Sequence, residues 1–224
     1  RILGLLGYPL AHSFSPPMQN AAFKHLSMNK IYIPIEVTPD DLGDVVKGIP
    51  KMNFDGFNVT KPHKVHIIEY LDEIDELARI IGAVNVVTIK NGVLKGYNTD
   101  GSGFVRSFEE EMRTSFCEKN VFVIGSGGAS RAICMTLAME SAKTIYICNR
   151  TYEKAVALSK DINKNIRDCC IPVMMKYGLI KEALYNAQII INTTSVGMFP
   201  NNEEIPLNEN LLHKELVVCD IVYN

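Results

Sequence analysis

Short apolar runs alternate with helix-length amphipathic segments along almost the whole chain, and this alternation constrains the fold more than any other feature. Each apolar run has the length of one strand, and each segment between two runs is long enough to cross back over a sheet. Because parallel strands need such crossovers, the order strand, helix, strand predicts mainly parallel sheets with helices packed on them. The sequence therefore predicts an α/β protein.

Two blocks of this pattern are separated by the stretch TSFCEKN, which breaks the helical periodicity of residues 102–112. We predict a domain boundary there, with domains 1–112 and 113–224. An Asn91-Gly92 pair between apolar runs also predicts a hairpin in the first block. The strands expected in that block are 2–7, 31–37 and 57–60, with helices near 16–26 and 39–48.

The second block contains five short apolar strands with helical patterns between them. This arrangement is typical of a doubly wound parallel sheet. The expected strands are 121–125, 144–148, 171–174, 188–192 and 216–222.

Composition excludes several classes of protein. With 47% hydrophobic and 21% charged residues, the 224-residue chain has an ordinary globular composition, and its net charge of -2 and scattered basic residues disfavour a nucleic-acid partner. Apolar runs such as 187–191 are too short to cross a bilayer, so we expect no membrane partner. The six cysteines form no C-x-x-C pair, which predicts a reducing cytoplasm, no disulfide framework and no metal site.

The stretch VFVIGSGGASRA places Gly125, Gly127 and Gly128 between an apolar strand and a helix. Such glycines let a pyrophosphate approach backbone N–H groups at the positive end of the helix dipole. Ser130 stands where a third glycine is usual, and glycines at a strand-to-helix turn can also reflect turn geometry alone. The flanking strands and helix favour a dinucleotide site.

The end of the next strand distinguishes NADP from NAD. NAD enzymes commonly carry an acid about 20 residues beyond the glycines, whereas a nearby Arg accommodates the 2′-phosphate of NADP. This chain reads CNRTYEK there, with no acid before Glu153. The segment favours NADP through Arg150, although Lys154 also suits a solvated loop.

A second polar segment, GFNVTKPHK, follows the strand pattern of the first block. Phe57 and Val59 alternate with Asn58 and Thr60, and Pro62 ends the strand because it lacks a ladder donor. The segment then presents three basic side chains: Lys61, His63 and Lys64. For most lysines in such a turn, a solvated surface is the ordinary explanation.

Several motifs occur in one order and together resemble the shikimate dehydrogenase family, including its quinate/shikimate relatives. They are GYPLAHSFSPPMQNAAF, GFNVTKPHK, GAVNVVTIKNGVLKGYNTDGSGF, GSGGASRA, NRT and NTTSVGM. The similarity extends from about Leu3 to Tyr223. It implies a substrate-binding N-terminal domain, a C-terminal Rossmann domain, and reversible NADPH-dependent reduction of 3-dehydroshikimate to shikimate in aromatic amino acid biosynthesis.

The resemblance also implies roles for individual residues. Lys64 and Asp100 would form the catalytic pair, because charge that builds on the ketone oxygen needs a cation or proton donor. Lys61 and His63 are then expected to face solvent. The residues implied to bind substrate are Ser13, Ser15, Asn58, Thr60, Asn85 and Tyr223. Ser15 could instead only cap its helix.

The implied cofactor residues fall into three groups on the C-terminal domain, although Met198 could equally be core packing. The pyrophosphate group is Gly125, Ser126, Gly127, Gly128 and Ala129; the adenosine-phosphate group is Asn149, Arg150, Thr151 and Lys154; the nicotinamide group is Thr193, Thr194, Ser195 and Met198.

Two alternative functions remain open at this stage. One is an NAD-preferring quinate/shikimate dehydrogenase, and the other is a catalytically silent NADP-binding regulator on the same scaffold. We expect a monomer or homodimer that binds a small-molecule substrate. The family continues beyond DIVYN with further segments, so we expect the sequence to be an excerpt.

Overall fold

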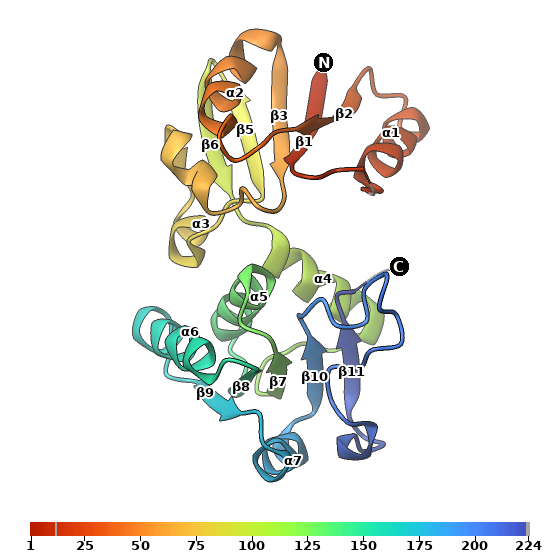
Figure 1. Cartoon of the computed structure of the whole chain (residues 1–224), viewed down its shortest axis with the longest axis vertical. Coiled ribbons are helices and arrows are strands. Elements are labelled where there is room, and N and C mark those ends of the chain that lie inside the picture. Colours follow the sequence, from red (N-terminus) through yellow and green to blue (C-terminus); the bar gives the residue numbers. More distant parts are fainter. Residues whose placement is uncertain (12, 223–224) are drawn as a thin grey trace. The chain divides into compact units, whose positions relative to one another are not determined.

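The computed structural model of the chain describes residues 1–11 and 13–222. They form two compact units, Arg1–Thr99 and a second unit that begins at Asp100 (Figure 1). The division therefore falls before α4 (Asp100–Met112) and not after it, where the sequence places the domain boundary. α4 belongs to the second unit because it packs on α5 (Gly128–Met139) so closely that a Cβ on Gly101 would overlap Ala132.

The sheet of the first unit is mixed, with the strand order β2-β1-β3-β5-β6-β4. β1 pairs in parallel with β2 and β3, but β5 is antiparallel to both β3 and β6. The prediction of mainly parallel pairing holds for β1–β2, β1–β3 and β4–β6, whereas the predicted hairpin at Asn91 and Gly92, which have φ of 52° and 81°, makes β5 and β6 antiparallel. The strands are β1 (Ile2–Gly7), β2 (Ile31–Glu36), β3 (Phe54–Val59), β4 (Glu73–Ile74), β5 (Val86–Lys90) and β6 (Val93–Tyr97).

Short helices cover this sheet and close its core. α1 contacts β2 and β1, whereas α2 packs against the 3-10 helix η2. Leu6, Val46, Ile67 and Val84 are all fully buried in the core that these elements enclose. The helices are α1 (Ser15–His25), α2 (Leu42–Gly48) and α3 (Glu76–Ile81), with 3-10 helices η1 (Ile49–Met52) and η2 (His66–Tyr70).

The second unit has a five-stranded parallel sheet with the order β11-β10-β7-β8-β9, which confirms the predicted doubly wound topology. α5 and α6 lie on one side of the sheet and α7 lies on the other (Figure 1). The elements not yet bounded are β7 (Asn120–Ile124), β8 (Thr144–Asn149), α6 (Tyr152–Asn165), β9 (Cys170–Met174), α7 (Tyr177–Asn186), β10 (Ile189–Asn192), η3 (Glu209–Leu211) and β11 (Val217–Asp220).

Each sheet has one edge strand that contains a proline. β2 lies at the edge of the first sheet and contains Pro34, which is paired with Leu5 of β1. β9 lies at the edge of the second sheet and contains Pro172, which is paired with Ile147 of β8. An edge position suits proline, because its missing N–H then faces away from the neighbouring strand.

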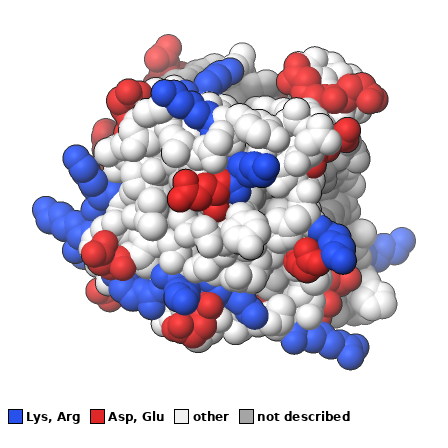
Figure 2. All heavy atoms as spheres, turned by 90° about the horizontal axis from the view of Figure 1, so that it is seen from below, with Lys and Arg blue, Asp and Glu red and all other residues white. Residues whose placement is uncertain are grey.

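Charges of both signs are interspersed on the face of the molecule drawn in Figure 2. That distribution fits the small net charge of -2 and offers no single-sign patch on this face. None of the helices in residues 1–11 and 13–222 has the length and apolar character needed to span a membrane.

Candidate active site

A tight glycine turn joins β7 to α5 in the second unit. Gly125 has a φ of +115°, and a Cβ there would lie 2.5 Å from Thr193 Oγ1. Gly127 is the N-cap of α5 and makes no side-chain capping hydrogen bond, and a Cβ on Gly127 or Gly128 would meet nothing within 4 Å. The turn therefore requires glycine at its start and leaves open space over its helix end. Both features suit the approach of a dinucleotide pyrophosphate.

Ser130 stabilises this turn from within. Its side chain is fully buried, and its Oγ donates a hydrogen bond of 2.8 Å to the Gly125 carbonyl oxygen. Ser130 replaces the third glycine of the usual pattern, and its hydroxyl links the start of α5 to the end of β7. The other two members of the predicted pyrophosphate group, Ser126 and Ala129, are half-buried.

The carboxyl end of β10 lies beside the glycine turn. Thr193 donates from its Oγ1 to the Ile124 carbonyl at 2.6 Å, and its backbone N–H donates to the same oxygen at 2.9 Å. Asn192 Oδ1 accepts from Thr194 N–H and Oγ1, while Asn192 Nδ2 donates to both carboxylate oxygens of Asp220 at 3.1 and 3.0 Å. This network orders the predicted nicotinamide segment. Sequence reasoning missed Asn192 and Asp220, although both sit at strand ends.

Ser195 and Met198 continue that segment in a turn. The backbone N–H of Met198 donates to the Ser195 carbonyl at 3.1 Å, and Gly197 between them has a φ of +90°. Met198 is half-buried and Ser195 is exposed.

The predicted adenosine-phosphate loop begins where β8 ends. The Gly125 N–H donates to the Cys148 carbonyl at 2.8 Å, so the loop starts next to the glycine turn. Asn149 Nδ2 donates to the Thr151 carbonyl at 2.9 Å, which fixes the loop, whereas the side chains of Arg150 and Lys154 are exposed. Exposed cations on an ordered loop can reach a phosphate without the cost of burying a charge.

In the first unit, backbone hydrogen bonds gather the predicted substrate residues at the end of β3. Thr60 N–H donates to the Leu6 carbonyl at 2.9 Å, and Val59 N–H donates to the Asn85 carbonyl at 2.8 Å. The Lys64 carbonyl accepts from Val84 N–H at 2.8 Å. The structure thus brings together three segments that carry Thr60, Lys64 and Asn85.

A buried tyrosine orients Asn58. The hydroxyl of Tyr32, which is 4% exposed, donates to Asn58 Oδ1 at 2.8 Å, and burial raises the pKa of Tyr32 to about 12. Asn20 of α1 in turn holds Tyr32, donating from Nδ2 to its carbonyl and accepting from its N–H. Sequence reasoning missed Tyr32 and Asn20. An aromatic residue in a strand pattern normally indicates only core packing.

Asn85 is held by a second polar contact. Its Oδ1 accepts from Thr99 N–H at 2.9 Å, and its Nδ2 donates to Thr99 Oγ1 at 3.1 Å. Asn85 is 9% exposed, so its amide is fixed in a nearly dry environment. A fixed amide can bind a hydroxyl with little additional loss of conformational entropy.

Ser13 and Ser15 lie together at the start of α1. Ser13 Oγ accepts from Ser15 N–H at 3.3 Å, and the N-cap residue is Phe14. Ser15 is therefore the first residue of the helix and not its cap. The alternative that Ser15 only caps α1 is wrong. Both side chains are half-buried at a helix N-terminus, where an anion is favoured.

His63 contradicts the expectation that it faces solvent. Its side chain is fully buried, and its Nε2 lies 2.7 Å from the Val37 carbonyl oxygen. The chain turns at this point because His63 N–H bonds to the Thr60 carbonyl, and this turn directs the imidazole into the core. Lys61 is exposed, as expected.

The predicted catalytic residues occupy ordered positions in their own units. Lys64 is half-buried just after this turn, and Asp100 is a half-buried residue that begins α4. Tyr223, expected near the substrate, lies outside the described residues.

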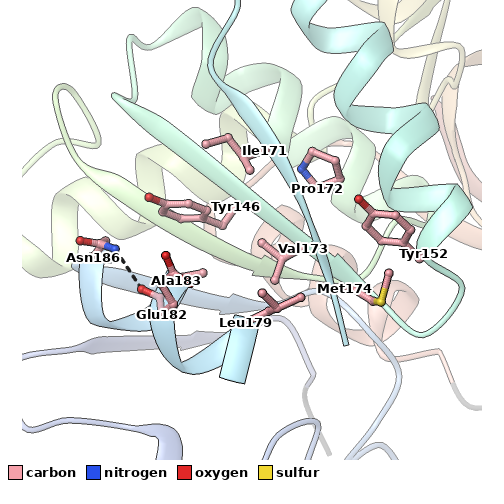
Figure 3. Close-up of a pocket in the computed structure, with 10 residues that line it drawn as sticks. All are labelled: Tyr146, Tyr152, Ile171, Pro172, Val173, Met174, Leu179, Glu182, Ala183 and Asn186. Atoms are coloured by element: carbon pink, nitrogen blue, oxygen red, sulfur yellow. Dashed lines mark hydrogen bonds between the residues drawn. The ribbon is translucent and has the colours of Figure 1, made fainter. Parts of the chain in front are cut away.

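A cavity of about 400 Å³ lies elsewhere in the second unit, on the α7 side of β8 and β9 (Figure 3). Tyr146 and Val173 from the sheet and Leu179 from α7 line it. None of the predicted site residues is among the described residues that line this cavity. Over residues 1–11 and 13–222, no three His, Cys, Asp or Glu side chains group as a metal site.

The parallel doubly wound sheet, with its glycine turn beside the ends of β8 and β10, defines the class of α/β proteins that bind a dinucleotide. Two family models match the chain. "Shikimate dehydrogenase substrate binding domain" matches residues 5–87, and "Shikimate / quinate 5-dehydrogenase" matches residues 108–222. The chain belongs to the shikimate dehydrogenase family, which confirms the resemblance found in the sequence.

Individual relatives agree with this placement. The chain is 42% identical over 225 residues to the shikimate dehydrogenase (NADP(+)) of Desulforamulus reducens, covering 100% of this chain and 77% of the relative. Shikimate 5-dehydrogenase from Listeria monocytogenes was solved with shikimate and NAD, and it is 36% identical to this chain with a TM-score of 0.93. The match covers 100% of this chain and 78% of the Listeria chain. Quinate dehydrogenase from Corynebacterium glutamicum, solved with NAD, is 29% identical with a TM-score of 0.90, covering 99% and 80%.

Proposed function

We propose that this protein is an NADP-dependent shikimate dehydrogenase, an oxidoreductase that interconverts 3-dehydroshikimate and shikimate. The observation that carries the proposal is the set of backbone hydrogen bonds that brings the segments of Thr60, Lys64 and Asn85 together at the end of β3. A lysine in the same part of the fold as a hydroxyl and an amide suits a substrate that carries ring hydroxyls and a ketone.

The glycine turn fits the cofactor because its space is open where the pyrophosphate must approach. Residues 125–129 would hold the pyrophosphate, while Arg150, Thr151 and Lys154 would surround the 2′-phosphate. Asn149 orders that loop through its bond to the Thr151 carbonyl, and residues 193–195 with Met198 would line the nicotinamide. When bound, NADPH supplies the hydride that reduces the ketone.

Lys64 and Asp100 are the proposed catalytic pair. The Lys64 ammonium donates a hydrogen bond to the ketone oxygen and stabilises the negative charge that develops there, and it can pass a proton to that oxygen. The Asp100 carboxylate keeps this ammonium charged and oriented.

The other residues of the first unit bind and orient the substrate. The hydroxyls of Ser13 and Ser15 would donate to its carboxylate. Asn58, Thr60 and Asn85 would satisfy its ring hydroxyls, and Tyr223 completes the proposed set. Because Asn58 and Asn85 are already fixed by Tyr32 and Thr99, they present their amides in one orientation.

A steady-state assay with shikimate and each oxidised cofactor tests the proposal. We expect shikimate-dependent formation of NADPH, with a higher kcat/KM for NADP than for NAD. A preference for NAD together with activity on quinate would support the alternative represented by the NAD-bound relatives. Cofactor binding without any turnover would support the catalytically silent regulator.

Cellular location and assembly are further proposals. All six cysteines are free thiols, which favours a reducing cytoplasm. We propose a monomer or homodimer that has a small-molecule substrate and no nucleic-acid or membrane partner, and size-exclusion chromatography with light scattering would measure the oligomeric state.

A further inference from the structure

The last residue pair of the β10 and β11 ladder carries two polar side chains, Asn192 and Asp220. Because paired residues of neighbouring strands point to the same face of the sheet, these two side chains meet. Asn192 is only 4% exposed, whereas Asp220 is exposed. The Asn192 Nδ2 donates to both carboxylate oxygens of Asp220, at 3.1 and 3.0 Å. A buried amide is thus joined to a surface carboxylate at the end of the sheet.

Both polar atoms of the Asn192 amide also hold the segment that follows β10. Asn192 Oδ1 accepts from the Thr194 N–H at 3.0 Å and from Thr194 Oγ1 at 2.7 Å, and its Nδ2 donates to the Val196 carbonyl at 3.3 Å. The Val196 N–H donates in turn to Thr194 Oγ1 at 3.2 Å. One amide therefore keeps residues 194–196 in a closed turn.

Asp220 determines which way this amide points. A carboxylate only accepts hydrogen bonds, so it can face the nitrogen of an amide but not its oxygen. If the Asn192 amide were turned over, its oxygen would face Asp220 and the Val196 carbonyl, and its nitrogen would face the Thr194 N–H. Each of these contacts would bring two acceptors or two donors together, which is costly for a buried amide. The carboxylate therefore selects the orientation that holds Thr194.

The segment after β10 is held from both neighbouring strands. Thr193 Oγ1 donates to the Ile124 carbonyl of β7, next to the glycine turn. On the other side, the side-chain connection to β11 passes through Asp220, whose Oδ1 also accepts from the Val222 N–H at 2.8 Å. Asp220 therefore connects the segment after β10 with the segment after β11.

We propose that Asp220 is a positioning residue for the nicotinamide half of NADP. This inference rests on the proposed function, in which residues 193–195 line the nicotinamide. Asp220 acts through Asn192, whose orientation sets the position of Thr194 and of the turn beside it. The adenosine half of the cofactor is assigned to the loop after β8, which is three strands away from β11 in the sheet. Loss of Asp220 should therefore weaken the contacts of one half of the cofactor only.

The test compares two ligands on the purified full-length protein: NADPH, and 2′,5′-ADP, which is the adenosine half of NADP without the nicotinamide. Asp220→Ala should weaken the binding of NADPH by about tenfold and change that of 2′,5′-ADP by less than about twofold, because it removes a charge-assisted hydrogen bond on the nicotinamide side. Fluorescence titration with NADPH and calorimetric titration with 2′,5′-ADP measure the two affinities.

Glu215→Ala is the matched control, because it removes an exposed carboxylate just before β11 and should change neither affinity. Equal weakening of both ligands by Asp220→Ala would assign Asp220 to folding and overturn the proposal. Unchanged binding of NADPH would also overturn it.

A reciprocal exchange tests the orientation itself. Asn192→Asp alone places a second carboxylate against Asp220 and should weaken NADPH binding more than Asp220→Ala does. When Asp220→Asn is added, the new amide at position 220 can donate to the new carboxylate at position 192, which still accepts from Thr194. We expect the double variant to bind NADPH about threefold more tightly than Asn192→Asp, or better. Absence of this recovery would overturn the proposal.

The two affinities require no turnover, so this test is independent of the activity assay. A protein that binds NADPH without oxidising shikimate would contradict the proposed function, and the ratio of the two affinities would still decide the role of Asp220. A protein that binds no NADPH would overturn both proposals.

Discussion

The two units prepare their sites by different physical means. In the first unit the proposed substrate residues are amides locked by other side chains, Asn58 by Tyr32 and Asn85 by Thr99. In the second unit, backbone geometry at Gly125 makes the turn, and the cation of Arg150 remains exposed. Ring hydroxyls are recognised by fixed hydrogen bonds, whereas a phosphate is held by backbone N–H groups and long-range charge. The comparison predicts that small changes in the first unit alter substrate use, and those in the second alter cofactor use.

The largest expected effect is that of Lys64→Ala. It should lower kcat by about a thousandfold with little change in KM, because the lost interaction belongs mainly to the transition state. Steady-state kinetics with shikimate measures this effect. Lys61→Ala is the control, since Lys61 is an exposed neighbour on the same segment and should keep normal kinetics. A nearly normal kcat for Lys64→Ala would refute the role of this lysine.

Gly125→Ala should have the next largest effect, because it combines a φ of +115° with a Cβ only 2.5 Å from Thr193 Oγ1. We expect a loss of about 2–3 kcal/mol of stability and weaker NADPH binding. Thermal unfolding and NADPH fluorescence titration measure the two quantities.

Gly103→Ala serves as the control for that substitution. Gly103 lies within α4, and a Cβ there would meet nothing within 4 Å. The Gly103→Ala protein should therefore gain about 0.5–1 kcal/mol of stability from the higher helix propensity of alanine. Equal stability of the Gly125→Ala and Gly103→Ala proteins would show that the turn tolerates a side chain.

Arg150→Ala should change cofactor preference and leave substrate use intact. Loss of a charge-assisted contact to the 2′-phosphate should raise KM for NADP by about tenfold, while KM for NAD stays close to its original value. Lys160→Ala removes an exposed cation from the same unit and should change neither constant. An equal rise for both cofactors would assign Arg150 to folding and not to phosphate recognition.

Tyr32→Phe should have the smallest effect, about 1 kcal/mol in the binding of substrate, because Asn58 loses one hydrogen-bond donor but keeps its position. It should appear as a higher KM for shikimate at unchanged KM for NADP. An altered KM for NADP alone would contradict the separation of the two sites.

The same variant sharpens the comparison through pH. The pKa of Tyr32 is raised from 10.0 to about 12 in the folded protein, so its contribution to stability is complete below pH 10 and is lost as the pH rises toward 12. Tyr32→Phe should therefore lose less stability than the original protein between pH 10 and 12. Urea unfolding at several pH values measures the difference.

Most elements of the fold could be predicted because their patterns are local. The strand expected at residues 2–7 is β1, and the Asn91-Gly92 signal correctly gave the hairpin of β5 and β6. The domain boundary differed because the place of α4 depends on its packing against α5, a contact between distant parts of the sequence. The prediction that His63 faces solvent was wrong for a similar reason, since its burial follows from a tertiary contact with Val37.

The site itself was only partly readable. Glycines, lysines and amides can be recognised as candidate site residues from their residue type, and the order of the motifs assigns them to a family. The partners that fix them are less visible, because Tyr32, Asn20 and Thr99 resemble ordinary core or loop residues in the sequence. Their roles depend on side-chain hydrogen bonds across several strands, and these appear only once the register of the sheet is known.

The prolines of the two edge strands affect the tendency of the chain to aggregate before it is fully folded. A bare strand edge can template a strand from another copy, which leads to aggregation. Pro34 in β2 and Pro172 in β9 each remove one donor from the outer rim of their sheet. When two newly synthesised molecules collide, a strand from one molecule would therefore lack one hydrogen-bond partner on each of these edges of the other.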